Sequence, residues 1–252
     1  MRCTIVILIV AFALSTPAMA QASDRDVQSI LSDISISDIS SRTVYQQIAN
    51  YRMGALRMAG LAAIGRGASA SSVQSVLSNA NISDISSGNV YQQIANYTAA
   101  NAKMLGVLAL SLRADEAAVN SVLSDESISD ISSRTVYQQI ANYAVANTKM
   151  AGIAALAAGA SRPTVDGVLS DASISDISSR TVYQEIANYT VANAKMLGVL
   201  AIALGADPAR VRSVLSDASI SDISSRNVYQ QIATYTAAVV KMTGVVASSK
   251  MR

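Results

Sequence analysis

The chain repeats itself every 46 residues. Equivalent tyrosines mark the period, at Tyr45, Tyr91, Tyr137, Tyr183 and Tyr229. A unit that starts at Ser23 divides the sequence into five repeats, at residues 23–68, 69–114, 115–160, 161–206 and 207–252. Because a repeat of this size buries its apolar face only against its neighbours, we predict one continuous repeat domain.

Each repeat contains two helical patterns. The first opens with Ser or Asp, which are preferred at helix N-caps, and continues with apolar residues at helical spacing, such as Val27, Ile30 and Leu31. The second starts near residue 43 and carries an apolar stripe, at Val44, Ile48, Tyr51, Ala55, Met58 and Ala62. We expect a short helix of about 10 residues and a long helix of about 22 in every repeat.

A Ser-rich linker, residues 35–41 in the first repeat, separates the two helices. Ser and Asp side chains compete for backbone hydrogen bonds and favour turns, so the linker should break the helix. The predicted fold is therefore an all-α solenoid of five 46-residue helix pairs. The alternation of Ile and Ser in the linker leaves open an α/β solenoid with a short strand there.

Residues 1–20 have the pattern of a secretory signal peptide. Arg2 precedes an apolar stretch at residues 4–14, and Ala18, Met19 and Ala20 form an A-x-A cleavage site. The apolar stretch is shorter than the roughly 20 residues that span a bilayer. We therefore expect an exported protein, located in the periplasm, on the outer surface or outside the cell.

Composition excludes several classes of function. Lys and Arg total 19 against 17 Asp and Glu, so there is no strong positive field to hold nucleic acid. The chain has no His, and its one Cys, Cys3, lies in the predicted leader. Without a base for a nucleophile or ligands for a metal, we expect neither an enzyme nor a cofactor. The spacing of Asp33 and Asp38 lacks the third acid and the glycine of a calcium loop.

One block of each repeat has changed less than the rest: residues 35–51 are identical to residues 127–143, whereas the short helices differ between repeats. This block is either a stack of buried polar side chains, including Asn50, Asn96, Asn142 and Asn188, or a binding strip offered five times. The candidate recognition strip comprises Asp38, Arg42, Tyr45, Asp84, Tyr91, Asp130, Arg134, Tyr137, Asp176, Arg180, Tyr183, Asp222, Arg226 and Tyr229.

The two ends of an open solenoid should differ from its middle. Arg52, Arg57 and Arg66 make the first repeat more basic, as expected for an end that meets water. The fifth repeat keeps an apolar surface, which would form head-to-tail contacts if exposed. We therefore expect self-association through Val239, Val240, Val245 and Val246.

The expected function is that of an exported structural or adhesive protein of the cell envelope or extracellular matrix, acting through a protein partner or self-assembly. A membrane-active protein is the first alternative, because residues 104–110 and 196–202 are apolar nearly all round. Such runs are short for a bilayer, and Lys103, Lys149 and Lys195 interrupt the start of the apolar half of the helix. A periplasmic binding protein is the second alternative, and it would require a discrete ligand pocket.

Overall fold

The computed structural model describes residues 23–33, 44–80, 90–125, 136–171, 182–217 and 228–249. These residues form ten helices and no strand, which confirms the all-α prediction. The long helices are α2 (Val44–Gly65), α4 (Val90–Ser111), α6 (Val136–Ala157), α8 (Val182–Ala203) and α10 (Val228–Ser248). The short helices are α1 (Asp24–Asp33), α3 (Ala70–Asn79), α5 (Glu116–Asp125), α7 (Arg162–Asp171) and α9 (Pro208–Asp217). The Ser/Ile linker, where the alternative placed a strand, lies outside the described residues.

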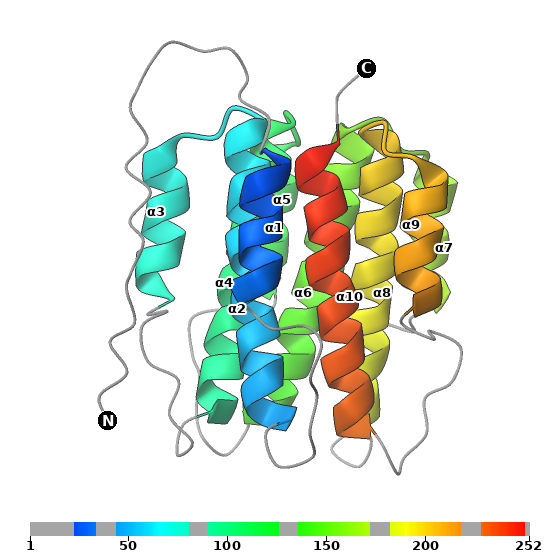
Figure 1. Ribbon diagram of the computed structural model, residues 1–252. Helices are drawn as coiled ribbons and strands as arrows, with labels where there is room; N and C mark the ends of the chain where they lie inside the picture. The colour runs from blue at the N-terminus through cyan, green and yellow to red at the C-terminus, as the bar shows by residue number, and fades with distance from the viewer. Residues whose placement is uncertain are drawn as a thin grey trace.

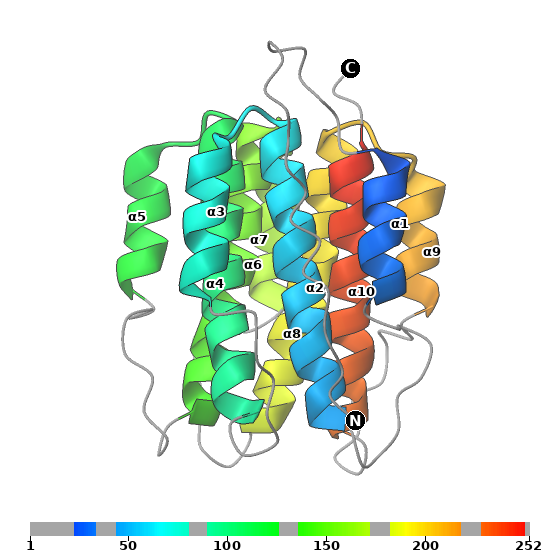
Figure 2. The ribbon, with the colours of Figure 1, turned by 60° about the vertical axis from the view of Figure 1, so that its left-hand side comes forward.

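The five long helices form a closed ring (Figures 1 and 2). Each packs against its two neighbours in the order of the chain, and α10 packs against α2 as extensively as the inner pairs pack. The short helices form an outer layer in which each lies over the groove between two long helices, α1 over α10 and α2, α3 over α2 and α4. The predicted open solenoid is thus replaced by a ring without free ends.

One contact is repeated at all five joints of the ring. A methyl group placed on Gly60 of α2 would lie 3.1 Å from Cγ1 of Val73 in α3 and 3.5 Å from the methyl of Met104 in α4. Gly244 makes the same contact with the first repeat, where Val27 would lie at 3.2 Å and Met58 at 3.6 Å. The last repeat therefore meets the first through the interface that joins every other pair.

The apolar residues of the fifth repeat are covered by the first repeat of the same chain. Val239, Val240 and Val246 are fully buried and Val245 is 4% exposed. Arg66 of α2 is also buried and donates to the carbonyl oxygens of Val246 and Ser249, at 3.3 and 2.8 Å. Cations stabilise such C-terminal carbonyls.

The expectation of an exposed apolar end at Val239, Val240, Val245 and Val246 is therefore wrong, because ring closure supplies the partner that an open stack lacks. The interpretation of Arg52 and Arg66 as water-facing residues is wrong for the same reason. Arg57 alone of the three arginines remains partly exposed.

The predicted helix boundaries are confirmed. Ser69 Oγ accepts from the N–H of Ser72 at 3.1 Å, and Asp207 Oδ1 accepts from that of Ala209 at 2.9 Å. Beyond the long helices, Gly159 and Gly205 have φ values of 95° and 85°, the left-handed conformation that suits glycine. The chain then turns sharply and runs back outside the ring (Figure 1).

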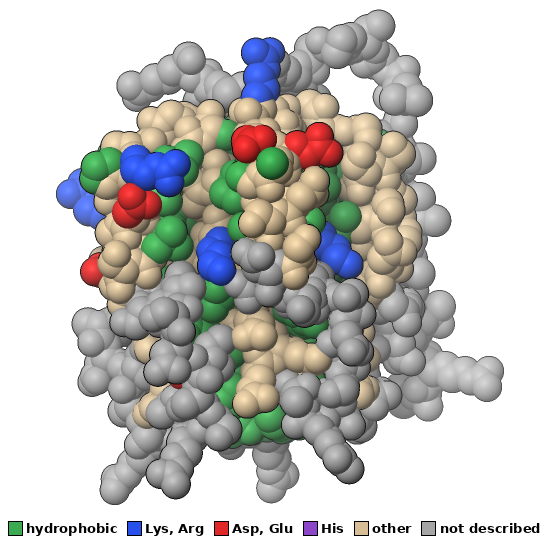
Figure 3. Space-filling model, turned by 180° about the vertical axis from the view of Figure 1, so that it is seen from behind, with side chains coloured by type: hydrophobic (Ala, Val, Ile, Leu, Met, Phe, Trp, Pro, Cys, Tyr) green, Lys and Arg blue, Asp and Glu red, His purple; other side chains and the backbone are tan. Residues whose placement is uncertain are grey.

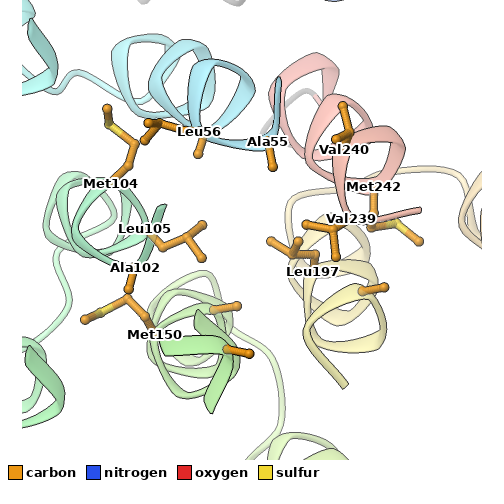
Figure 4. Packing of buried hydrophobic residues seen from close by; sticks show 14 of the residues in the cluster. Ala55, Leu56, Ala102, Met104, Leu105, Met150, Leu197, Val239, Val240 and Met242 are labelled. Atoms are coloured by element: carbon orange, nitrogen blue, oxygen red, sulfur yellow. The ribbon is translucent and has the colours of Figure 1, made fainter. Parts of the chain in front are cut away.

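The predicted apolar stripe of the long helix is buried in the first repeat, from Val44 to Ala62. Burial of the apolar second half is incomplete, since Leu110 and Ile202 are 43% and 47% exposed. Among the described helices, α8 is the one long and apolar enough to cross a membrane, and 72% of its apolar window is buried in the protein. Figure 4 shows Leu105, Leu197 and Val239 pointing into the space that the long helices surround.

Candidate functional site

The tyrosines that mark the repeat meet in a closed ring on the axis of the molecule. Tyr45, Tyr91, Tyr137, Tyr183 and Tyr229 each contact two others edge to face, with ring centroids 4.8 to 5.1 Å apart. Each tyrosine is the second residue of its long helix, so all five helices begin at this end. Edge-to-face contact is the favoured geometry for aromatic pairs, and here it closes without a gap.

The phenol hydroxyls of this tyrosine ring are linked by hydrogen bonds, as between Tyr45 and both Tyr91 and Tyr229. Burial, together with the hydrogen bond with Tyr183, raises the pKa of Tyr229 to about 12. Burial also raises the pKa of Tyr45, Tyr137 and Tyr183. These four tyrosines are therefore neutral at physiological pH.

Behind the tyrosines lies a ring of isoleucines, at Ile48, Ile94, Ile140, Ile186 and Ile232. The two rings line a recess whose volume open to water is about 20 Å³. One water molecule needs about 10 to 15 Å³ measured in this way. The recess therefore has no room for an organic substrate, and its chemistry is that of a neutral, largely apolar cap at one end of the ring.

Beyond the isoleucines, the interior becomes polar. Arg52 is 1% exposed, and its Nη2 donates to Oγ1 of Thr190 at 2.8 Å. Because α2 and α8 are not neighbours in the ring, the Arg52 side chain crosses the interior. Its Nε and Nη1 atoms are buried and have no hydrogen-bond partner among the described residues. Burial lowers the pKa of Arg52 to about 10, which leaves the guanidinium charged at neutral pH.

Asparagines occupy the position three residues after that of Arg52 in the second, third and fourth repeats, at Asn101, Asn147 and Asn193. Asn147 is satisfied: its Nδ2 donates to the carbonyl oxygens of Thr98 and Tyr143, at 2.8 and 2.7 Å, and its Oδ1 accepts from Asn101 at 2.5 Å. Oδ1 of Asn101 has no partner, and neither Oδ1 nor Nδ2 of Asn193 has one. Since buried polar groups are almost always paired, Arg52, Asn101 and Asn193 are the exceptional polar groups of this interior.

The candidate recognition strip is described only in part. The five tyrosines are brought together, which their regular spacing did not by itself require. The aspartates and arginines of the strip, Asp38, Arg42, Asp84, Asp130, Arg134, Asp176, Arg180, Asp222 and Arg226, lie outside the described residues. The strip as a binding surface therefore stays a prediction.

The expected stack of buried asparagines is wrong. Asn96 and Asn188 are exposed, and Asn50 and Asn142 are partly exposed. The buried asparagines are instead Asn101, Asn147 and Asn193, which lie five residues further along the long helix in the second, third and fourth repeats. The long helix turns that second position toward the axis and the first toward the outside.

Sequence reasoning missed the polar interior around Arg52. The signal was present in a comparison of the repeats at this position, where the other four have Thr98, Ala144, Thr190 and Thr236. A charged residue at a position that is otherwise small, on a helix whose other residues are largely apolar, indicates a buried charge. The three asparagines likewise stand where the first and fifth repeats have Ala55 and Val239.

Comparison with protein-family models, with curated proteins and with solved structures finds no match to this chain. Within the described ranges no group of three or more His, Cys, Asp or Glu side chains is placed to hold a metal ion. The site is thus defined by geometry alone, as the neutral tyrosine cap and the polar interior of a closed ring of helix pairs.

Proposed function

We propose that this protein is an exported, non-enzymatic structural or adhesive module that offers one surface five times to a protein partner. The observation that supports this proposal is where the least changed block of the repeat lies. The described part of this block, residues 44–51, opens α2, and the equivalent residues of the other repeats open α4, α6, α8 and α10. The described part of all five copies thus lies at the end of the ring that the tyrosines close.

The outer layer of short helices differs from this end of the ring. The short helices have diverged between repeats, and their surface carries both signs of charge (Figure 3). A surface of mixed charge has no field that would select a polyanion, which favours a protein partner over nucleic acid. A repeated end face beside a variable outer layer is the pattern expected when one end binds and the rest is only solvated.

Membrane insertion has less support than partner binding. To enter a bilayer, α8 would have to leave the ring and would lose its contacts with both α6 and α10. The outer contacts with α7 and α9 would also be lost. Such an opening would expose apolar surface of at least four other helices to water, at a cost that one inserted helix does not offset.

Cell-surface retention tests the proposal. Gln46, Gln92 and Gln138 follow the ring tyrosines directly and are partly exposed. Their combined substitution by Lys should release the protein from the envelope into the medium while the melting temperature of the purified protein stays the same, because three charges would have to be desolvated against a fitted partner.

The matched control places three lysines on the outer layer, at Gln28, Gln74 and Asn120, which are exposed. This variant should remain in the envelope fraction. Equal release of both variants, or release of the unmodified protein, would contradict the proposal.

A further inference from the structure

We propose that the interior of the ring is a binding site for one small, singly charged anion, a halide or a one- or two-carbon carboxylate, held by Arg52 and Asn193. This inference goes beyond the proposed function and does not depend on it, because the end face and the interior are separate parts of the molecule.

The charge of Arg52 is the first step. Its guanidinium crosses the interior from α2 to Thr190 of α8, and it is 1% exposed. Burial is the one cause that lowers its pKa, and no described carboxylate acts on it. A buried charge normally requires an opposite charge beside it. The described residues of the chain place no such opposite charge beside Arg52.

The unmet hydrogen bonds are the second step. Arg52 leaves the N–H of Nε and the two N–H bonds of Nη1 without acceptors. Asn193 lies three residues after Thr190, on the same side of α8 and one turn away, and both of its amide atoms are also unpaired. Because both are unpaired, exchanging the amide oxygen and nitrogen does not remove the problem. Arg52 belongs to α2 and Asn193 to α8, two long helices that are not neighbours in the ring.

The small side chains around Arg52 are the third step. Ala55 is one turn beyond Arg52 and stands where the second, third and fourth repeats have Asn101, Asn147 and Asn193. Ala55 is fully buried. An alanine there is smaller than an asparagine by one carboxamide group, which is close in size to formate. The side chains at the level of Arg52 are also small, Thr98, Ala144, Thr190 and Thr236.

The chemistry of the ligand follows from these three steps. The site has a positive charge and several N–H donors, so it selects an anion that accepts hydrogen bonds. It has one positive charge in an enclosed, largely apolar ring, so it selects a single negative charge. The tyrosine and isoleucine rings close one end with a recess of about 20 Å³, so the anion enters when the ring opens locally or when the chain folds.

Anion-dependent stability tests this site. The purified full-length chain is unfolded in urea and refolded at constant ionic strength in sodium gluconate, chloride, formate or acetate, and the melting temperature is measured. Gluconate is too large for the interior and serves as the reference. A ligand that binds only the folded state raises its stability, so we expect a saturable rise in melting temperature with at least one of the small anions.

Arg52→Thr is the matching variant, because Thr occupies this position in three other repeats. It should abolish the saturable rise while melting in gluconate at least as high as the unmodified protein, since the unpaired charge is gone. Asn193→Val, which copies Val239 of the fifth repeat, should weaken the apparent affinity at least tenfold. Arg25→Thr removes an exposed charge of α1 and should keep the full rise.

A direct measurement separates a bound ion from a general salt effect. Crystals of the unmodified protein grown or soaked in bromide should show an anomalous peak within hydrogen-bond distance of Arg52 and Asn193. The same rise in melting temperature for Arg52→Thr and the unmodified protein, or an interior without an anomalous peak and without a rise in any small anion, would overturn the proposal. In that case Arg52 would be a brace to Thr190 alone, and its removal would lower the melting temperature equally in all four salts.

Discussion

Arg113 occupies a position that is glycine in three other repeats. It follows α4 with a φ of 66°, where Gly67, Gly159 and Gly205 have φ values of 92°, 95° and 85°. A side chain with a Cβ is strained in this left-handed conformation, whereas glycine adopts it without cost. The repeat therefore requires this turn even where its sequence disfavours it.

Arg113→Gly should raise the free energy of unfolding by about 0.5 to 1 kcal/mol, the strain relieved less the entropy that glycine adds to the unfolded chain. Urea denaturation measures this change. Gly159→Arg is the reverse substitution, and it should destabilise the protein by a similar amount. A loss of stability in Arg113→Gly would show that the arginine side chain contributes more than its backbone costs.

The hydrogen-bonded tyrosine ring makes stability depend on pH above 10. Burial raises the pKa of Tyr229 from 10.0 to about 12, while the phenol of the unfolded chain loses its proton near pH 10. The stability contributed by the protonated ring is therefore complete below pH 10 and is lost as the pH rises toward 12. We expect a falling melting temperature across this range.

Tyr229→Phe should make the decline with pH shallower, because one titrating group is removed. It should also lower the free energy of unfolding at pH 7 by about 0.5 to 1.5 kcal/mol, the usual contribution of a hydrogen bond. Parallel melting curves for the two proteins would instead indicate that the lysines, present in both, cause the alkaline decline.

At the scale of elements, the joint between helix pairs depends on the absence of a side chain. A Cβ at Gly198 would lie 3.0 Å from Cγ1 of Val211 and 3.5 Å from the methyl of Met242. Gly167 of α7 is also inside a helix, but a Cβ there would meet nothing within 4 Å. Substitution by Ala therefore adds the same methyl group at a closely packed position, Gly198, and at an unobstructed one, Gly167.

Gly198→Ala should lower the free energy of unfolding by about 1 to 3 kcal/mol, because the outer helix must move away from the joint. Gly167→Ala should raise it by up to about 1 kcal/mol through helix propensity alone. Thermal and urea unfolding of the two variants measure the difference. If both substitutions stabilised the protein, the joint would be looser than the contact with Val211 implies.

At the scale of the whole molecule, five repeats close a ring in which every interface is used. Deleting residues 115–160 removes one complete repeat and leaves four helix pairs whose joints are built for five. An open solenoid would tolerate this deletion as a shorter stack, whereas a ring would be left with two uncovered apolar faces.

The four-repeat chain should therefore melt lower than the unmodified protein and should associate through its uncovered faces. Light scattering with size-exclusion chromatography gives its mass, and circular dichroism its helix content. A stable monomer with a melting temperature close to that of the five-repeat chain would contradict closure as the source of stability.

The sequence determined the local structure of this protein. The 46-residue period, the Ser and Asp caps, the 10- and 22-residue helices and the apolar stripe from Val44 to Ala62 could be predicted because each depends on residues near in the chain. The tertiary structure decided how the pairs assemble, because the turn between successive pairs depends on contacts such as that of Gly60 with Val73 and Met104. That turn closes after five repeats, and closure both buries Val240 and encloses Arg52 and Asn193 in one interior, which the comparison of repeats cannot show because it relates positions and not distances.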